Sequence, residues 1–386
     1  MVGCKVDFSI QYNQSYLTRY NQMKKLIVAS PIFKDYDLPV KKLSELSINT
    51  ESIVIAILFV ESNMKYSILK PEENKQTSTY FNEDSKLLLE DGSGKVHLVF
   101  KKTFKKLDFY CSGLVLGFVG KLNDQGIFEC SDVIFPDSLK PRQNTDLPAS
   151  SEKQKSSKIL IMSNICINQN NFEKMRFFLN FYTDKVQEVI VLGNVFSNEP
   201  EDFDFHYFNQ LFTDQACKVT IVPGINDPTC RAYPQAPFHK MLFDSSVSNV
   251  SFVSNPWQGM LLNRNFVFLN HQIISDILKY DAFFYDNVSN VQNAIHEDMD
   301  VIKQMVKTRY IAPSCPDTLP SLPYLEQDPF LIDKCDFIIA GGSKESGISE
   351  QNGVFCICVE DFSQSSGCVL LDLDRNVFEN IHFSGF

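Results

Sequence analysis

The sequence predicts two domains of different class, an N-terminal helix with a small all-β barrel and then an α/β domain. Three observations support this. The 386 residues exceed what one ordinary hydrophobic core organises. Short β-branched strand patterns crowd residues 52–135, whereas apolar strands alternate with helices from residue 158 onward. A segment rich in Pro, Ser and charge, 136–157, lies between the two patterns and is predicted to be the linker.

Net charge favours some functions and disfavours others. Residues 1–155 carry 21 basic against 19 acidic side chains, whereas residues 156–386 carry 15 against 28. Because phosphate contacts supply most nucleic-acid affinity, we expect the acidic part to repel DNA. The excess of acidic side chains in this part is typical of a solvated surface or of a surface that binds a partner with basic patches. No apolar run approaches about 20 residues and no secretory leader pattern is visible, so we expect an intracellular chain without a membrane span.

The first region, 1–45, is predicted to hold one docking helix. Apolar and aromatic residues recur at helical spacing over 12–29, and Pro31 ends the pattern. The residues expected near its buried face are Tyr12, Tyr16, Leu17, Tyr20, Met23 and Ile27.

The second region, 46–135, is predicted to be a closed barrel of the oligonucleotide/oligosaccharide-binding (OB) type, because several short strands follow one another with tight turns. A small sandwich is the alternative. The strands are expected at 52–59, 86–90, 95–100, 113–122 and 127–135.

The third region, 158–386, begins with apolar strands separated by helices, which implies parallel strands covered on both faces. A run of short strands and a Pro-rich loop at 311–324 follow. The strands are expected at 158–163, 188–193, 218–224, 251–254, 259–263, 264–270, 336–342, 353–361, 367–373 and 376–383, and the helices at 171–184, 202–214 and about 287–307.

This order of elements resembles the calcineurin-like metallophosphoesterases, whose domain is a β-sandwich flanked by helices. The resemblance implies two metal ions held at strand ends by motifs of the form D-x-H, G-D-x-x-D, G-N-H-[D/E] and G-H-x-H, together with a lone His. Here the chain offers mostly neutral residues instead, so these positions are predicted to be an eroded metal site. They are Ser163, Ile165, Asn194, Ser197, Ile225, Asn226, His271 and Gly342.

Other catalytic patterns are equally weak. The sequence has no G-x-S-x-G elbow, no P-loop and no G-x-G-x-x-G after a strand. One His at a strand end cannot hold two cations, and is more often a hydrogen-bonding residue. We therefore predict no catalytic residue, no metal and no cofactor.

Two loops contain residues, mainly Pro and Gly, that change the conformational freedom of the backbone. On physical grounds alone they are stiff surface loops, since Pro restricts φ and Gly permits positive φ. Their order, however, resembles the P-G-x-x-D-P…P-Q-x-P-x-H and P-D-T-L segments of the DNA polymerase alpha/delta/epsilon B-subunit family. The residues that carry the resemblance are Pro223, Gly224, Asp227, Pro228, Pro234, Gln235, Pro237, His239, Pro316, Asp317, Thr318 and Leu319.

Within that family the delta type matches best, through Gln11-Tyr12, Thr18-Arg19 and Gln22-Met23-Lys24 near one end and Phe383-Ser384-Gly385-Phe386 at the other. The resemblance implies a nuclear, non-catalytic scaffold in DNA replication. It implies binding to the cysteine-rich C-terminal domain of a polymerase delta catalytic subunit and to a third subunit linked to the sliding clamp, without tight direct DNA binding.

Two alternatives remain open. An active metal-dependent phosphodiesterase or nuclease would need the missing ligands. A nucleic-acid-binding barrel would need exposed aromatic rings on a basic groove. The residues that suggest the second alternative are Lys101, Lys102, Lys105 and Lys106 with Phe104 and Phe109. The candidates for interface anchors are the loop 311–324, Tyr233, Phe238 and Trp257, and core burial is the alternative for each of them.

Overall fold

The computed structural model describes a helix-and-barrel unit and a sandwich unit. It describes residues 13–65, 77–82, 84–101, 109–139, 157–197, 202–213, 215–244, 247–280, 297–324 and 327–383. The N-terminal unit comprises Met1–Leu139 with Ile274–Asp333, and the C-terminal unit comprises Lys140–Ile273 with Lys334–Phe386. Among the described residues, no helix is both long and apolar enough to cross a bilayer.

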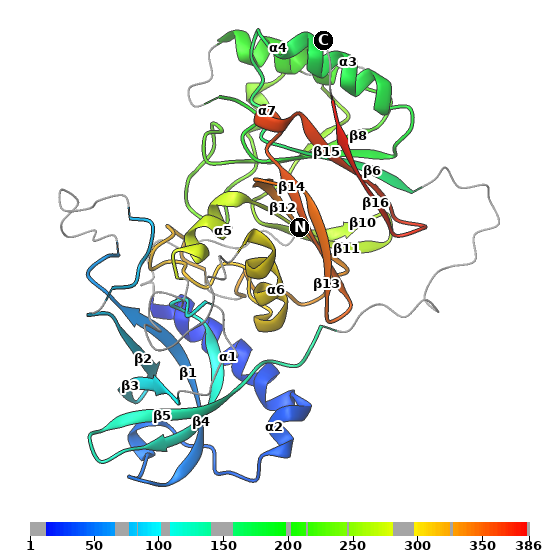
Figure 1. The fold of residues 1–386 in the computed structure, drawn as a ribbon. Coiled ribbons are helices and arrows are strands. Elements are labelled where there is room, and N and C mark those ends of the chain that lie inside the picture. Colours follow the sequence, from blue (N-terminus) through cyan, green and yellow to red (C-terminus); the bar gives the residue numbers. More distant parts are fainter. Residues whose placement is uncertain are drawn as a thin grey trace. The chain divides into compact units, whose positions relative to one another are not determined.

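The predicted barrel is confirmed as a closed one, so the sandwich alternative for this region is wrong (Figure 1). Its strand order is β1-β2-β3-β5-β4, with β3 and β5 parallel and the other neighbours antiparallel. Closure removes the exposed sheet edges that would otherwise recruit further strands. The elements are β1 (Glu51–Glu61), β2 (Lys86–Asp91), β3 (Gly94–Phe100), β4 (Val115–Leu122), β5 (Ile127–Ile134) and the short 3-10 helix η1 (Leu43–Glu45).

The N-terminal helix forms as α1 (Asn13–Ala29) and is followed by α2 (Pro31–Asp35). The predicted buried face is only partly right. Met23 and Ile27 are buried, but Leu17 is exposed, and Tyr12 lies outside the described residues. The buried face instead includes polar Ser15, Thr18 and Arg19, because tertiary partners satisfy Arg19.

Residues 274–333 correct the predicted domain boundary, which assigned them to the sandwich. They group with the barrel unit. The Gln304 amide donates to the carbonyl oxygen of Phe109 and accepts from its N–H, at 2.9 and 3.1 Å. The strand pattern of the sequence does not predict such contacts between the segment 274–333 and the barrel region. Helix α6 runs over Asp298–Thr308, shorter than predicted, and 287–296 lie outside the described residues, as do 140–156 of the predicted linker.

The C-terminal unit is the predicted sandwich, made of two mixed sheets with the orders β16-β15-β6-β7-β8-β9 and β10-β11-β12-β14-β13. Strands β6, β7, β8 and β9 are parallel, as are β11, β12 and β14. The strands are β6 (Lys158–Ser163), β7 (Glu188–Leu192), β8 (Lys218–Val222), β9 (Val250–Phe252), β10 (Trp257–Leu261), β11 (Arg264–Asn270), β12 (Phe337–Ser343), β13 (Gly347–Gln351), β14 (Val354–Glu360), β15 (Gly367–Asp372) and β16 (Val377–His382). Strand β13 was not predicted. The helical elements are α3 (Phe172–Tyr182), α4 (Asp202–Phe212), η4 (Lys240–Leu242), α5 (His271–Leu278), which crosses the unit boundary, and α7 (Phe362–Ser365).

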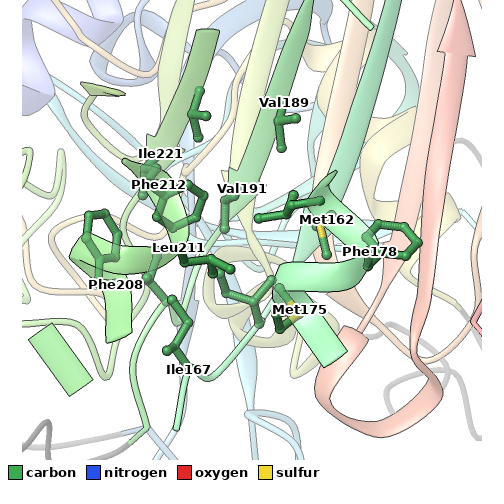
Figure 2. Packing of buried hydrophobic residues seen from close by; sticks show 14 of the residues in the cluster. Met162, Ile167, Met175, Phe178, Val189, Val191, Phe208, Leu211, Phe212 and Ile221 are labelled. Atoms are coloured by element: carbon green, nitrogen blue, oxygen red, sulfur yellow. The ribbon is translucent and has the colours of Figure 1, made fainter. Parts of the chain in front are cut away.

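Alternating side chains of β6 feed two cores, as the period of a strand requires. Leu160 and Met162 face α3 and α4, where they join Met175 and Phe178 (Figure 2). Ile159 and Ile161 face the other sheet. The central strands β6, β7 and β8 of the six-stranded sheet are therefore buried on both sides, which explains why they look almost continuously apolar.

Candidate functional site

The parallel strands of both sheets end at one edge of the sandwich, which we call the strand-end edge. Ser163 ends β6, Asn270 ends β11, and Gly193 directly follows β7. A methyl group on Gly193 would lie 3.2 Å from Cβ of Asn270 and 3.3 Å from Oδ1 of Asn164. In open α/β sheets, ligands bind at this end of the strands. Asn164, Gly193 and Asn270 therefore lie close together at this edge, and each is a sequence neighbour of a predicted motif position.

The backbone at this edge keeps unusual conformations. Asn164 and Asn194 have φ of 48° and 32°, and Gly342 has φ of 89°. Asn tolerates the left-handed region better than most residues, because its short amide can hydrogen-bond locally. Such conformations cluster at functional sites and persist only when the surrounding fold enforces them. The backbone at this edge is therefore held in conformations that the surrounding fold enforces.

The side chains at the strand-end edge do not fit a pair of metal ions. Asn194 stands where the sequence resemblance expects a bridging carboxylate, and its Oδ1 already accepts from the backbone N–H of Asn226 at 3.0 Å. A methyl group on Gly224 would lie only 2.4 Å from that oxygen. Two cations need anionic bridging and several free lone pairs. Within the described ranges, no three His, Cys, Asp or Glu side chains gather as a metal site.

The remaining motif positions have structural surroundings. Ile165 belongs to the core between β6 and the helices, and so turns away from the edge. His271 begins α5, and its Cβ lies 2.9 Å from where a methyl group of Gly342 would be. Ile225 is partly exposed, whereas Ser197 is half-buried just beyond the bridge of Ile167 with Phe196.

Three residues with polar side chains at this edge, Asp361, Asn270 and Ser343, were not predicted from the sequence. Asp361 accepts from the Asn164 amide at 2.9 Å. The side-chain oxygens of Ser163, Asn270 and Ser343 are buried without a hydrogen-bond partner in the described chain. Ser343 and Asn270, like Asp361, occupy no metal-motif position. The only signal available for the first two was a polar residue closing an otherwise apolar strand.

A network of amides joins the two sheets beside this edge. Gln235 donates to the carbonyl oxygen of Gly224 at 2.7 Å, and Asn255 donates to Gln235 Oε1 at 3.0 Å. Asn255 Oδ1 also accepts from the N–H of Asn270 at 3.3 Å. The network therefore runs from the loop after β8 to the end of β11. These amide hydrogen bonds cross-link the two sheets of the C-terminal unit beside the edge.

The family loop 223–239 is anchored by Asp227, which is almost fully buried. Its carboxylate accepts from the N–H groups of Gly224 at 2.6 Å and Phe196 at 3.1 Å. The Tyr233–Pro234 peptide is cis, Tyr233 and Phe238 are buried, and His239 caps η4 by accepting from the N–H of Met241. Tyr233 and Phe238 are therefore core residues and not exposed anchors. The other loop prolines are Pro223, Pro228 and Pro237.

Burial raises the pKa of Asp227 to about 7, although the N–H donors lower it. A raised pKa means that between pH about 4 and about 7 the folded state holds a proton that the unfolded state has lost. We expect the free energy of unfolding to fall in that window, by at most about 1.4 kcal/mol per pH unit, as pH rises. The Asp227→Asn variant should have a shallower slope in urea unfolding series, and exposed Asp244→Asn is the control. Equal slopes in the wild type and D227N would contradict the assignment.

The second predicted loop belongs to the N-terminal unit and is also structural. Asp317 pairs with Lys65 at 2.5 Å, Thr318 donates to Asp276 at 2.7 Å, and Leu319 is buried. The peptide before Pro316 is cis. Most apolar side chains of 311–324 are therefore packed rather than presented to a partner.

The barrel offers little of a stacking platform in the part that is described. Phe109 is fully buried, and Lys101 is exposed. Lys102, Phe104, Lys105 and Lys106 lie outside the described residues. Trp257 is half-buried and stacks on Phe268 at 5.2 Å, so it too packs within its own sheet.

Comparison with known proteins finds similarity in both units. A family model of the DNA polymerase delta OB-fold domain matches residues 11–133, and one of the alpha/epsilon DNA polymerase B subunits matches residues 159–347. The DNA polymerase delta small subunit of Arabidopsis thaliana is 24% identical over 97% of this chain and 91% of its own length. That of Saccharomyces cerevisiae is 25% identical over 81% and 73%. A solved archaeal phosphodiesterase covers 58% of this chain and 99% of its own, at 12% identity and a TM-score of 0.33.

Proposed function

This chain belongs to the family of DNA polymerase alpha, delta and epsilon B subunits, and from that membership we propose that it is the non-catalytic scaffold subunit of a delta-type replicative polymerase. It would bind the cysteine-rich C-terminal domain of the catalytic subunit and a third, clamp-linked subunit in the nucleus. Matches to delta small subunits over nearly the whole chain favour the delta type.

The proposal that the chain is non-catalytic rests on the side chains at the strand-end edge. Asn194 stands where the sequence resemblance expects a bridging carboxylate and is hydrogen-bonded to the chain itself. Function must be argued from the site and not from the fold. Besides amides and hydroxyls, the edge offers the carboxylate of Asp361 and the imidazole of His271, which are fewer anionic and imidazole ligands than two metal ions need.

Co-purification tests the partner part. We expect the full chain, co-expressed with the C-terminal domain of its cognate delta catalytic subunit, to elute as a one-to-one complex in size-exclusion chromatography. The same domain from the cognate alpha or epsilon catalytic subunit is the matched control and should elute separately. A folded chain that binds none of the three would overturn the proposal.

The catalytic alternative is tested on the same preparation. Elemental analysis should find no stoichiometric transition metal, and bis-p-nitrophenyl phosphate should not be hydrolysed when Mn²⁺ is added. Turnover that disappears with Asn194→Ala, but not with exposed Asn180→Ala, would make the chain an enzyme after all.

A further inference from the structure

Two buried side-chain oxygens at the strand-end edge have no hydrogen-bond partner within the described residues. They are Oγ of Ser163, which ends β6, and Oδ1 of Asn270, which ends β11. Ser163 is 0% exposed and Asn270 is 5% exposed. Burying a polar group without a partner costs the hydration of that group, and native proteins rarely leave such a group unpaired. Each of these oxygens therefore calls for a partner from outside the chain.

Strand register and close contacts bring the two oxygens to neighbouring positions. Asn270 pairs with Gly341 across the parallel strands β11 and β12. A methyl group on Gly341 would lie only 2.8 Å from Oγ of Ser163, which belongs to the other sheet. Ser343, two residues further along β12, has a third buried oxygen without a partner in the described chain. Gly341 therefore stands between Ser163 and Asn270, and its lack of a side chain lets the two sheets approach each other here.

Another oxygen at this place belongs to the amide of Asn164, whose orientation is fixed by a hydrogen bond. Its Nδ2 donates to the carboxylate of Asp361 at 2.9 Å. Oδ1 of the same amide lies 3.3 Å from the point that a methyl group on Gly193 would occupy. Cβ of Asn270 lies 3.2 Å from the same point. Two residues with amide oxygens thus border one small space beside Gly193.

The chemistry of these oxygens favours a cation over an anion or a single water molecule. An amide oxygen only accepts hydrogen bonds, and a hydroxyl oxygen can accept as well. The charged group that is hydrogen-bonded to them is the carboxylate of Asp361, whereas Lys344 is exposed beside exposed Glu345. A water molecule has two hydrogens to donate, but a cation can be shared by several acceptors. Acceptors next to a carboxylate therefore select a positive ligand.

The number of charged ligands decides which class of cation fits. Zinc sites use Cys and His, and Ca²⁺ sites use several carboxylates. Within the ranges that the structure describes, no three His, Cys, Asp or Glu side chains gather as such a site. K⁺, in contrast, is held by neutral carbonyl oxygens that replace its hydration shell. A set of amide and hydroxyl oxygens beside one carboxylate suits an ion of single charge.

We propose that the strand-end edge binds one alkali-metal cation, K⁺ or Na⁺, through Oγ of Ser163 and the amide oxygens of Asn164 and Asn270. The cation joins the end of β6 to the end of β11 and so cross-links the two sheets of the C-terminal unit. Its role is to stabilise the edge. The inference goes beyond the proposed function and does not depend on it, because it concerns the fold of one unit of this chain.

Thermal unfolding in matched salts tests the cation site. The full chain is unfolded in NaCl, KCl and choline chloride at equal ionic strength. Fluorescence of the single Trp257, which begins β10, reports on the C-terminal unit. A ligand that binds only the folded state raises the midpoint, and the rise follows the occupancy of the site. We expect NaCl or KCl to raise the midpoint by about 2–4 °C over choline chloride, and the larger rise identifies the ion.

Three variants locate the effect. Ser163→Ala removes one ligand with little change in volume, and Asn270→Ala removes another. We expect each to lose the difference between the alkali-metal salts and choline chloride. Ser251→Ala is the control, because Ser251 is exposed in β9 of the same sheet as Ser163, and it should keep the whole difference. Circular dichroism before heating confirms that each variant is folded, and N270A decides if S163A does not fold.

The contrary outcomes are distinct. Equal midpoints of the wild type in all three salts would overturn the cation site. A difference that S163A and N270A both keep would also overturn it, since the cation would then bind elsewhere. A rise that stays linear in salt concentration, instead of being half complete at a defined concentration, would show a general salt effect and no site. These measurements use no partner subunit, so their failure leaves the proposed function untouched.

Discussion

Replacing Arg19 by Met is expected to lower the free energy of unfolding of the N-terminal unit by about 3–5 kcal/mol, because removal of one partner strands the others of a buried ion pair. The Arg19 side chain is fully buried and bonds Asp328 at 3.2 Å. It also donates to three buried carbonyl oxygens at 2.7 to 3.1 Å, and its guanidinium lies 4.6 Å from the ring centroid of Tyr310. The carbonyls belong to Gly113, Pro313 and Cys315.

Urea unfolding followed by circular dichroism would measure this loss, and hydrogen exchange would locate it in α1 and the 311–324 loop. Lys25→Met is the control, because Lys25 is exposed in the same helix. Arg19→Lys restores the charge, but one ammonium group lacks the planar fork that reaches several carbonyls, so it should recover only part of the loss. A variant R19M as stable as K25M would show that this network contributes nothing net.

Replacing Asp276 by Ala is expected to lower the free energy of unfolding by about 3–5 kcal/mol, since the hydroxyl groups of buried Tyr80 and Ser314 and of half-buried Thr318 would lose their shared acceptor. Tyr80 donates to Oδ1 at 2.7 Å, while Ser314 and Thr318 donate to Oδ2 at 2.6 and 2.7 Å. These donors join the barrel region to the segment after α5. Burial raises the pKa of Asp276, although the three hydroxyls lower it.

A raised pKa means that the surroundings of Asp276 favour an uncharged side chain more than water around an exposed aspartate does. Asp276→Asn should therefore cost less than D276A, and its free energy of unfolding should fall less steeply as pH rises through the raised pKa. Denaturant unfolding at several pH values measures both effects. Exposed Asp84→Ala should be neutral. Loss of stability in D84A as large as in D276A would refute the role of burial.

Local patterns predicted most of the elements. The expected strand 158–163 is β6, and the expected strands on either side of the turn after Asp91 are β2 and β3. These elements depend on apolar periodicity and turn residues within a few positions, so a single sequence contains the information. The motif positions at the strand ends came from the resemblance to the calcineurin-like metallophosphoesterases, and parallel strands bring such ends to one edge of a sheet.

Local patterns failed where burial depends on distant partners. Arg19 was not among the residues expected on the buried face of the helix, yet it is buried because Asp328, 309 positions away, and distant carbonyls satisfy it. Tyr233 and Phe238 were candidates for interface anchors with core burial as the alternative, and both are buried.

Residue type and short-range spacing predicted that a barrel precedes an α/β domain, and the resemblance to the calcineurin-like metallophosphoesterases added the sandwich and the motif positions at the strand ends. Long-range packing, in contrast, groups 274–333 with the barrel, links the two sheets through amides and leaves particular apolar residues facing solvent. These features escape a local pattern because a polar or apolar side chain is stabilised by whatever surrounds it, and those surroundings come from parts of the chain that no short window contains.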